Sequence, residues 1–338
     1  MPRKIIVVQR ARKMRLKSRS ILQVFIPRRG GGEPQIREVP IRDIEALIVI
    51  GRNNYIESSV LSVLAQHNIP TAVIAKDSTA ILYNPIITIS NNARRAQYEA
   101  PKQFKLAIAA HYIWARLKGM AGIIEYYTGY KPPVPPPPIP KGRNIQEIDP
   151  QTLEYEIRTW EAGSSATLWK QIIQLIPEET RRRLERQGLT GRKPRSPDPF
   201  NKTITIAYAI LYSLSTKALL AAGLDPTHGL LHRTHYNTPL SFDYSEMLKP
   251  TAIHTALTLA RTNNLPETSP EGELLEGQTT KIIGTLYRIL QQRHRKTNKT
   301  IHYYIYTKAQ HLSKTLQTRK INPNKLTITY NKKNFQIT

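Results

Sequence analysis

Residues 103–127, QFKLAIAAHYIWARLKGMAGIIEYY, repeat apolar residues three and four positions apart over roughly seven helical turns. This spacing gathers apolar side chains on one side of an α-helix, so the stretch predicts a long helix packed against a core. A helical domain therefore begins near residue 95. Further helical patterns follow at 152–175, 201–222, 244–262, 272–293 and 300–316.

The first ninety residues show a different pattern. Short stretches rich in β-branched residues are separated by turn-prone pieces such as RRGGGEP, and they predict strands at 4–9, 20–26, 45–50 and 79–89. One helix, at 58–68, interrupts them. We therefore predict an α+β fold, in which a small antiparallel β domain (1–92) precedes a larger all-helical domain (93–338).

Two segments of the second domain do not have a helical pattern. The run KPPVPPPPIP at 131–140 cannot continue a helix, because proline lacks the amide donor. It predicts an extended surface connection, or a docking site for another protein. The last residues, 325–338, alternate like two short strands about an Asn/Lys turn.

The composition indicates a folded protein with a polyanionic partner. Fifty Lys and Arg against twenty-four Asp and Glu leave a net charge of +26 on 338 residues, which favours nucleic acid. No apolar run reaches the roughly 18 residues of a membrane span. The N-terminus has too short an apolar stretch for a secretory signal, so we expect a cytoplasmic protein. Because cysteine is absent, any metal site must use His, Asp or Glu.

The stretch HGLLHRTHYNTPLSFDYSE, at 228–246, concentrates histidine and acidic residues. His228 and His232 are four apart and would share one face of a helix, as in a zinc pair. In a metalloprotease a glutamate follows the first histidine, but here Gly229 has that place. Spacing alone therefore favours loop or surface positions for these two and for His235.

Three acidic residues are candidates for chemistry. Asp243 and Glu246 fit a capping box as well as they fit a metal site, and both descriptions can hold together. Glu161 lies between Trp160 and the small residues 162–166. That setting is consistent with a crevice, although a lone glutamate on a helix is usually a solvated residue.

A basic cluster lies at 181–195. Such a cluster binds phosphates through charge and carries little base information, and its alternative is a solvated basic face. Given the net charge, we expect nucleic-acid contacts here, from Arg181, Arg182, Arg183, Arg192, Lys193 and Arg195.

Five segments, taken in order, resemble the CRISPR-associated integrase of spacer acquisition, the catalytic subunit of the adaptation machinery. The opening contains VPIRDIEALIVIG, and WEAGSSATLW resembles the first acidic motif of this family. The later segments are similar to its arginine and DP-N segment, its histidine motif and its second acidic motif; they read GRKPRSPDPFNKTITIAYAILY, AAGLDPTHGLLHR and PLSFDYSEMLKP. The resemblance covers most of the chain.

The resemblance implies a set of site residues. Glu161, His232 and Glu246 correspond to the metal ligands of the family, and Asp243 to a nearby acid in the catalytic site. Arg233, directly after His232, joins the expected DNA contacts. Two carboxylates and one imidazole suit Mg²⁺ or Mn²⁺. The chain departs from the family at Ala162, where glycine commonly follows the first Glu.

The resemblance also implies an activity and partners. The activity is metal-dependent endonuclease and integrase chemistry, in which the 3′-hydroxyl end of a short double-stranded DNA is joined to a CRISPR repeat without ATP. The implied partners are DNA, a second copy of the chain bound through the β domain, and a small companion protein of ferredoxin-like fold. Two alternatives stay open: a non-catalytic nucleic-acid scaffold, and a related nuclease or mobile-element integrase.

Overall fold

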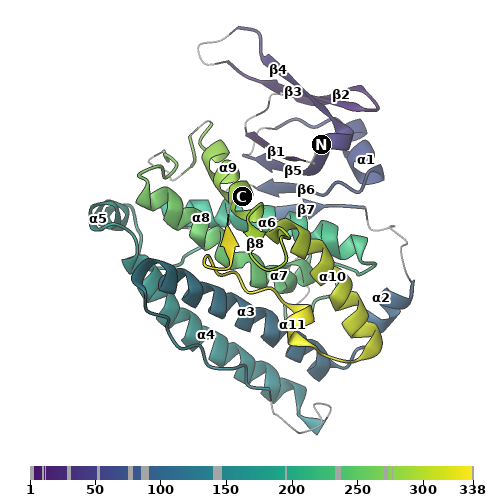
Figure 1. The fold of residues 1–338 in the computed structure, drawn as a ribbon. Coiled ribbons are helices and arrows are strands. Elements are labelled where there is room, and N and C mark those ends of the chain that lie inside the picture. Colours follow the sequence, from purple (N-terminus) through teal and green to yellow (C-terminus); the bar gives the residue numbers. More distant parts are fainter. Residues whose placement is uncertain are drawn as a thin grey trace.

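The computed structural model describes residues 4–9, 11, 13–28, 32–51, 54–74, 79–84, 91–139, 147–194, 196–232, 237–269, 273–275 and 277–336. A strand-rich part contains the N-terminus, and a larger helical part lies below it in Figure 1. This arrangement confirms the predicted α+β class.

The described residues of the strand-rich part form two sheets. The three-stranded sheet is antiparallel, as predicted, and consists of β2 (Lys13–Ser18), β3 (Ile21–Ile26) and β4 (Gln35–Pro40). The other sheet has the order β1-β5-β6-β7, with bounds Lys4–Gln9, Ile44–Ile50, Thr71–Ile74 and Thr79–Leu82. A short 3-10 turn, η1 (Ile41–Asp43), leads from β4 into β5.

The pairing in the four-stranded sheet differs from the antiparallel prediction. Strands β1, β5 and β6 run parallel, and β7 is antiparallel to β6. The helix α1 (Ser58–Gln66) carries the chain back between β5 and β6, so both strands start from the same edge. The apolar pattern of a strand does not reveal which other strand pairs with it or in which direction. The sequence therefore did not distinguish parallel from antiparallel pairing in this sheet.

The four-stranded sheet is covered on both faces. On β5, Leu47 and Val49 belong to the core of the strand-rich part, whereas Ile48 belongs to the core of the helical part. On β1, Ile6 faces the first core and Ile5 packs against the second. Strands buried on both faces are continuously apolar, which explains the run ALIVI in β5.

The predicted long helix at 103–127 is α3 (Lys102–Thr128), which ends at Gly129 with the left-handed φ of 77°. The other helices correspond in large part to the predicted patterns. They are α2 (Asn91–Tyr98), α4 (Pro150–Gln174), α5 (Glu178–Arg186), α6 (Pro199–Ala221), α7 (Pro239–Ser245), η3 (Glu246–Leu248), α8 (Lys249–Arg261), α9 (Thr279–Leu290), α10 (Ile301–Thr318) and α11 (Pro323–Leu326).

Helix α6 is the central helix of the helical part. It contacts α7, α8, α9 and α10 as well as strands β5 and β6. In the described parts of the chain it alone is long and apolar enough to cross a membrane, but 83% of its most apolar window is buried inside the protein. Its apolar surface is therefore used in the protein's own core.

Helices α3 and α8 approach closely because α3 has a glycine at the crossing. A Cβ atom on Gly119 would lie 2.5 Å from Cγ and 2.9 Å from Cβ of Pro250, at the start of α8. The crossing brings α3 against η3 and α8. These are the elements that carry Glu246 and Lys249.

We expect Gly119→Ala to destabilise the protein by about 1–3 kcal/mol, because the added methyl group forces the two helices apart. Urea unfolding followed by circular dichroism measures the change. Gly163→Ala is the matched control, since a Cβ atom at this exposed position in α4 meets nothing within 4 Å. That substitution should stabilise the helix by up to about 1 kcal/mol. Equal effects at the two sites would contradict the close crossing.

The two non-helical segments both pack back onto the helical part. In the described residues 131–139 of the proline run, Pro132 is buried, and Val134 and Ile139 contact the core. The C-terminal prediction of paired strands is wrong: α11 is followed by an extended stretch, and β9 (Phe335–Gln336) pairs with β8 (Arg293–His294). The alternating apolar residues of the tail are those that pack against helices. A β-hairpin with one buried face would have the same alternating pattern, so the pattern did not separate the two structures.

The tail is anchored by a buried histidine. Nδ1 of His254, on α8, lies 2.6 Å from the hydroxyl of Tyr330, and its Nε2 lies 3.1 Å from the hydroxyl of Tyr127. Burial lowers the pKa of His254 to about 3, with a further contribution from the charge of Lys332. The folded protein therefore keeps this imidazole neutral.

Stability should consequently fall in acid. Below the unfolded pKa of about 6.5 the unfolded chain binds a proton at His254 that the folded chain excludes, so His254 lowers the free energy of unfolding by about 2 kcal/mol between pH 7 and pH 5. Thermal melts across this range measure the loss, which His254→Gln should reduce. His67→Gln, at an exposed position, is the control for removing a histidine. An unchanged pH profile in His254→Gln would contradict a buried neutral ring.

Candidate active site

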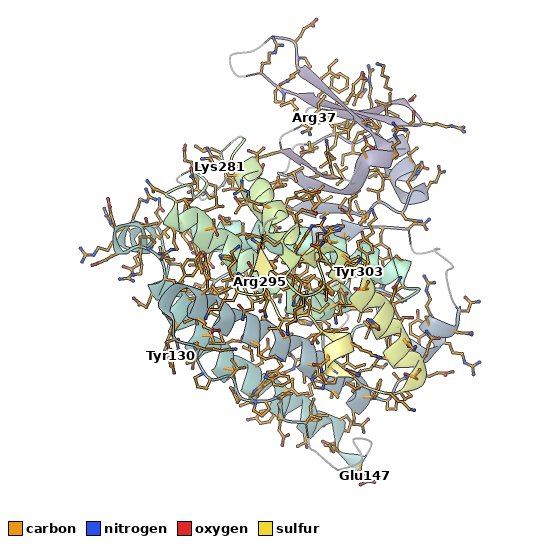
Figure 2. All side chains as sticks on the ribbon, viewed as in Figure 1. Arg37, Tyr130, Glu147, Lys281, Arg295 and Tyr303 are labelled. Atoms are coloured by element: carbon orange, nitrogen blue, oxygen red, sulfur yellow. The ribbon has the colours of Figure 1, made fainter. Side chains whose placement is uncertain are left out.

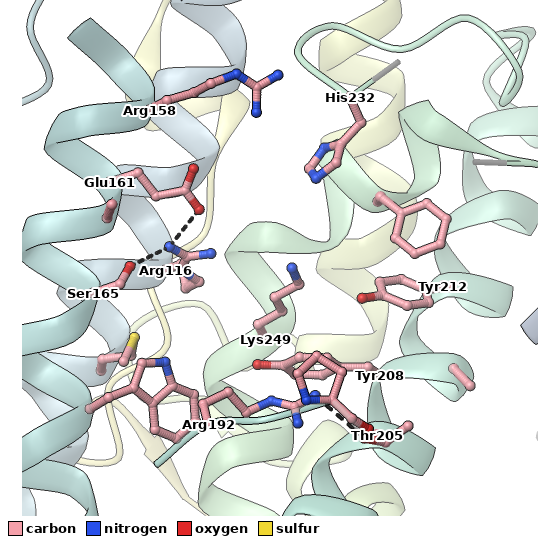
Figure 3. Close-up of a pocket in the computed structure, with 16 residues that line it drawn as sticks. Arg116, Arg158, Glu161, Ser165, Arg192, Thr205, Tyr208, Tyr212, His232 and Lys249 are labelled. Carbon is pink, nitrogen blue, oxygen red and sulfur yellow. Dashed lines mark hydrogen bonds and ion pairs between the residues drawn. The ribbon is translucent and has the colours of Figure 1, made fainter. Parts of the chain in front are cut away.

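The predicted acidic and histidine motifs meet at one cavity of about 850 Å³. Its wall is formed by side chains from α3, α4, α6, α7 and α8 and from the loop before α7. In Figure 3, Glu161 and His232 extend into it from opposite sides, with Arg116 next to Glu161 and Lys249 between the two sides. The cavity therefore joins residues from distant parts of the sequence.

Glu161 is held in place by α4. The helix starts at Asp149, whose side chain accepts a hydrogen bond from the amide of Thr152 at 2.8 Å, and Pro150 occupies the first turn. Ala162 and Ser165 line the same cavity as Glu161, so the expectation of a crevice beside this residue is confirmed.

Asp243 positions His232. It is buried on α7, and its carboxylate accepts hydrogen bonds from the backbone amides of Leu230, Leu231 and His232 at 2.6, 3.1 and 3.2 Å. It also lies 2.5 Å from Nδ1 of the His232 imidazole. A carboxylate that binds one ring nitrogen of a histidine orients the ring and selects its tautomer.

The same contact changes the basicity of the ring. Burial by itself lowers the pKa of His232, but the hydrogen bond and the charge of Asp243 outweigh it, and the net pKa is raised. The loop that presents the ring needs a glycine. A Cβ atom on Gly229 would lie 2.5 Å from the carbonyl oxygen of His232 and 3.1 Å from Asp243 Oδ2.

The capping-box interpretation of Asp243 and Glu246 is wrong. The N-cap of α7 is Thr238, and both acids lie inside the helical segments α7 and η3. The side chain of Glu246 is buried and pairs with two cations: Nη1 of Arg116 lies 2.5 Å from Oε2, and Nζ of Lys249 contacts Oε1. Burial by itself raises the pKa of Glu246. The charges of Arg116 and Lys249 have the opposite and larger effect, and the net pKa is lowered to about 2.

Arg116 was missed by sequence reasoning. It lies on α3 with a side chain only 11% exposed, and it bridges the two acidic motifs. Its Nη2 donates to Oε1 of Glu161 at 2.9 Å and to the hydroxyl of Ser165 at 2.7 Å. The available signal was the one arginine in the interior of a mostly apolar helical stretch.

The donor set suits a divalent metal ion, but the structure arranges it around cations of the chain. Glu161 and His232 line the cavity, and Glu246 contacts Arg116 and Lys249 in its wall. Two carboxylates and an imidazole are suitable ligands for Mg²⁺ or Mn²⁺. In the described part of the chain, no three His, Asp or Glu side chains form a group that could hold a metal ion.

The other two histidines of the 228–246 stretch have different positions. Nε2 of His228 lies 2.8 Å from Nζ of Lys105, and its ring packs edge-on against Tyr98. These contacts attach the loop to α2 and α3, which agrees with a structural position for His228. His235 lies outside the described residues.

The predicted basic cluster is divided by the structure. Arg192 lines the cavity, where its guanidinium lies 5.2 Å from the ring centre of Tyr208, and Lys193 lines an adjoining pocket. The DP-N segment holds this loop, because Oδ1 of Asn201 accepts from Arg192 Nη1 and from the amide of Lys193, both at 3.0 Å. Asp198 in turn caps α6.

The remaining basic residues lie elsewhere. On α5, Arg181 donates to Gln174 at 2.7 Å, Arg182 pairs with Glu178, and Arg183 donates to Asn263 at 3.2 Å. Arg195 and Arg233 lie outside the described residues. Basic side chains extend outward around both parts of the molecule, as the labelled Arg37 on β4 and Lys281 on α9 illustrate in Figure 2.

Known proteins share this sequence pattern and this fold. Residues 6–319 match the family model described as CRISPR associated protein Cas1. The CRISPR-associated endonuclease Cas1 of Hyperthermus butylicus is 25% identical over 304 residues, which cover 84% of this chain and 88% of that protein.

Two solved structures are similar over nearly the whole chain. A casposase bound to integration product has a TM-score of 0.77 at 18% identity, covering 97% of this chain and 94% of that one. A chain of a Cas6-RT-Cas1–Cas2 complex has a TM-score of 0.69 at 16% identity, covering 98% of this chain and 36% of that one.

Proposed function

Because the chain belongs to the family described as CRISPR associated protein Cas1, we propose that it is a DNA endonuclease and integrase of CRISPR adaptation. In the proposed reaction, the 3′-hydroxyl of a short double-stranded DNA attacks a phosphodiester at a CRISPR repeat. A new phosphodiester forms, the old bond breaks, and the target strand leaves with a free 3′-hydroxyl. The observation that carries this proposal is that Glu161 and His232 line one cavity together with Arg116 and Lys249, the two cations that pair with Glu246.

The side chains of the cavity match this chemistry. Glu161, His232 and Glu246 would hold Mg²⁺ or Mn²⁺, which when bound polarises the scissile phosphate and neutralises charge that develops on it. Asp243 keeps the His232 ring turned toward the cavity through its contact with Nδ1. Arg116 and Lys249 line the cavity and offer positive charge to a phosphate.

The DNA backbone would run along the basic wall beside this cavity. Arg192 lies in both the cavity and the adjoining pocket, where Lys170 and Lys193 add two further charges. These groups bind phosphates without reading bases, which suits a protein that accepts fragments of many sequences. We propose Arg181, Arg182 and Arg183 as more distant backbone contacts, together with Arg195 and Arg233.

The partners follow from the same proposal. Residues 1–92 would form the dimerisation domain, since β4 is an edge strand and Ile36 on it is 49% exposed. A small ferredoxin-like companion protein would join two such dimers; the presence of a similar chain in a Cas1–Cas2 complex supports this assignment. Sedimentation of the pure protein as a monomer would contradict the dimer. We also propose that the protein acts in the cytoplasm.

A strand-transfer assay tests the function. A labelled duplex with 3′-hydroxyl ends is incubated with Mn²⁺ and a plasmid that carries a CRISPR repeat, and joined product is expected. The same duplex with 3′-dideoxy ends should give none, because the attacking oxygen is missing. Metal-dependent cleavage without joining would instead indicate a nuclease. Salt-sensitive DNA binding with neither reaction would indicate a scaffold.

A further inference from the structure

We propose that Arg116 is an internal counter-cation, which occupies the ligand carboxylates of the site before DNA binds and moves to a DNA phosphate as the divalent metal ion enters. This inference rests on the proposed function, because it assigns Glu161 and Glu246 as ligands. Its consequence is that the metal ion and DNA bind cooperatively.

The contacts of Arg116 place it where a metal ion would have to compete. Its two terminal nitrogens reach different carboxylates, with Nη1 2.5 Å from Oε2 of Glu246 and Nη2 2.9 Å from Oε1 of Glu161. The other oxygen of Glu246 contacts Nζ of Lys249. Both oxygens of one ligand and one oxygen of the other are therefore already bound to cations of the chain.

The four charges that are in direct contact balance one another without a metal ion. Arg116 and Lys249 carry two positive charges against the two negative charges of Glu161 and Glu246. The side chains of Arg116 and Glu246 are only 11% and 4% exposed, so solvent and salt screen this cluster weakly. A divalent ion added to a balanced cluster leaves two uncompensated positive charges, and the phosphates of bound DNA can compensate them.

Arg116 is better suited than Lys249 to move. Its Nε is buried and has no acceptor among the described residues, so the guanidinium is incompletely hydrogen-bonded where it lies. The planar guanidinium also matches two phosphate oxygens at once. Arg116 borders the cavity and so has access to a phosphate placed there. Lys249, three residues after Glu246, stays beside its own carboxylate.

A Mn²⁺ titration followed by electron paramagnetic resonance tests the exchange, because the signal of free Mn²⁺ disappears on binding. The unaltered protein is titrated alone and with a duplex that ends in 3′-dideoxy nucleotides and cannot react. We expect the duplex to tighten Mn²⁺ binding by at least about fivefold. By the same coupling, Mn²⁺ should tighten binding of the duplex by an equal factor.

The variant Arg116→Met separates the exchange from a bracing role. If Arg116 competes with the metal ion, its removal should tighten Mn²⁺ binding in the absence of DNA by at least about fivefold. Addition of the duplex should then tighten Mn²⁺ binding less than it does in the unaltered protein. If Arg116 only orients the carboxylates, Mn²⁺ binding should weaken, and the proposal would be overturned. Arg261→Met is the matched control: it removes an arginine on α8 that donates to the carbonyl oxygen of Leu175 and does not line the cavity. Titrated without DNA, it should bind Mn²⁺ as the unaltered protein does.

Two further measurements keep the test decisive if Arg116→Met does not fold, as judged by circular dichroism. Arg116→Lys replaces the two terminal nitrogens that reach different carboxylates with one ammonium nitrogen, so the two contacts are not both reproduced and Mn²⁺ binding without DNA should again tighten. Equal Mn²⁺ affinity of the unaltered protein with and without DNA would overturn the proposal directly. Failure of the proposed function has a different signature: cooperative binding of Mn²⁺ and DNA with no strand transfer.

Discussion

Glu161→Gln is expected to reduce strand transfer by on the order of a thousandfold or more, while DNA binding is retained. The substitution keeps the size of the side chain and an oxygen that can accept from Arg116, but it removes the charge that would hold the metal ion. A bound metal ion contributes several kcal/mol of transition-state stabilisation, and each 1.36 kcal/mol is a factor of ten in rate.

The joined product from the strand-transfer assay, quantified against time with Mn²⁺, measures the loss. Glu156→Gln is the matched control, because Glu156 lies on the same helix but is exposed and does not line the cavity. A gel-shift measurement on each variant reports DNA binding separately. Strand transfer by Glu161→Gln at the rate of the unaltered protein would remove Glu161 from the site.

Asp243→Asn is expected to weaken Mn²⁺ binding about 10- to 100-fold and also to destabilise the fold. The carboxylate accepts three backbone amides and contacts Nδ1 of His232. An amide offers one acceptor oxygen and introduces an NH₂ group that opposes these donors. Each buried donor left without an acceptor costs about 1–3 kcal/mol, so the loop that presents His232 should loosen.

Thermal melts and a Mn²⁺ titration in the presence of duplex DNA separate the two effects. Asp225→Asn is the control: Asp225 is in the same loop and accepts from the amide of Thr227 and the hydroxyl of Tyr98, away from the His232 ring. It should lower stability while the Mn²⁺ affinity stays close to that of the unaltered protein. If both variants lose the same metal affinity, Asp243 has no specific effect on the imidazole.

Much of the site was recognisable from the sequence because its residues lie in short motifs. The segments around Glu161, His232 and Glu246 carry the family resemblance within a few residues of each ligand, and the structure brings them to one cavity. The functions of neighbouring residues were less visible. From the sequence Asp243 could be a helix cap or a ligand, and only its contacts with the loop at 230–232 show that it orients His232.

Much of the secondary structure was also predictable from the sequence, because helical and strand patterns depend on neighbouring residues. Helical periodicity in 103–127 and strand patterns in the first ninety residues are local, and both appear in the structure. The pairing of strands is not local. Parallel β1, β5 and β6, and the tail strand that joins β8, depend on which segments return to the same place in space.

The sequence by itself therefore determined the fold class, the positive charge and the identity of the candidate ligands, because periodicity, composition and motifs are properties of neighbouring residues. Only the tertiary structure decided that Arg116 joins Glu161, 45 positions away, and Glu246, 130 positions away. An arginine in an apolar stretch can be buried only where opposite charges meet it. Which charges do so is set by helix packing, and α3 reaches them because Gly119 lets it approach α8.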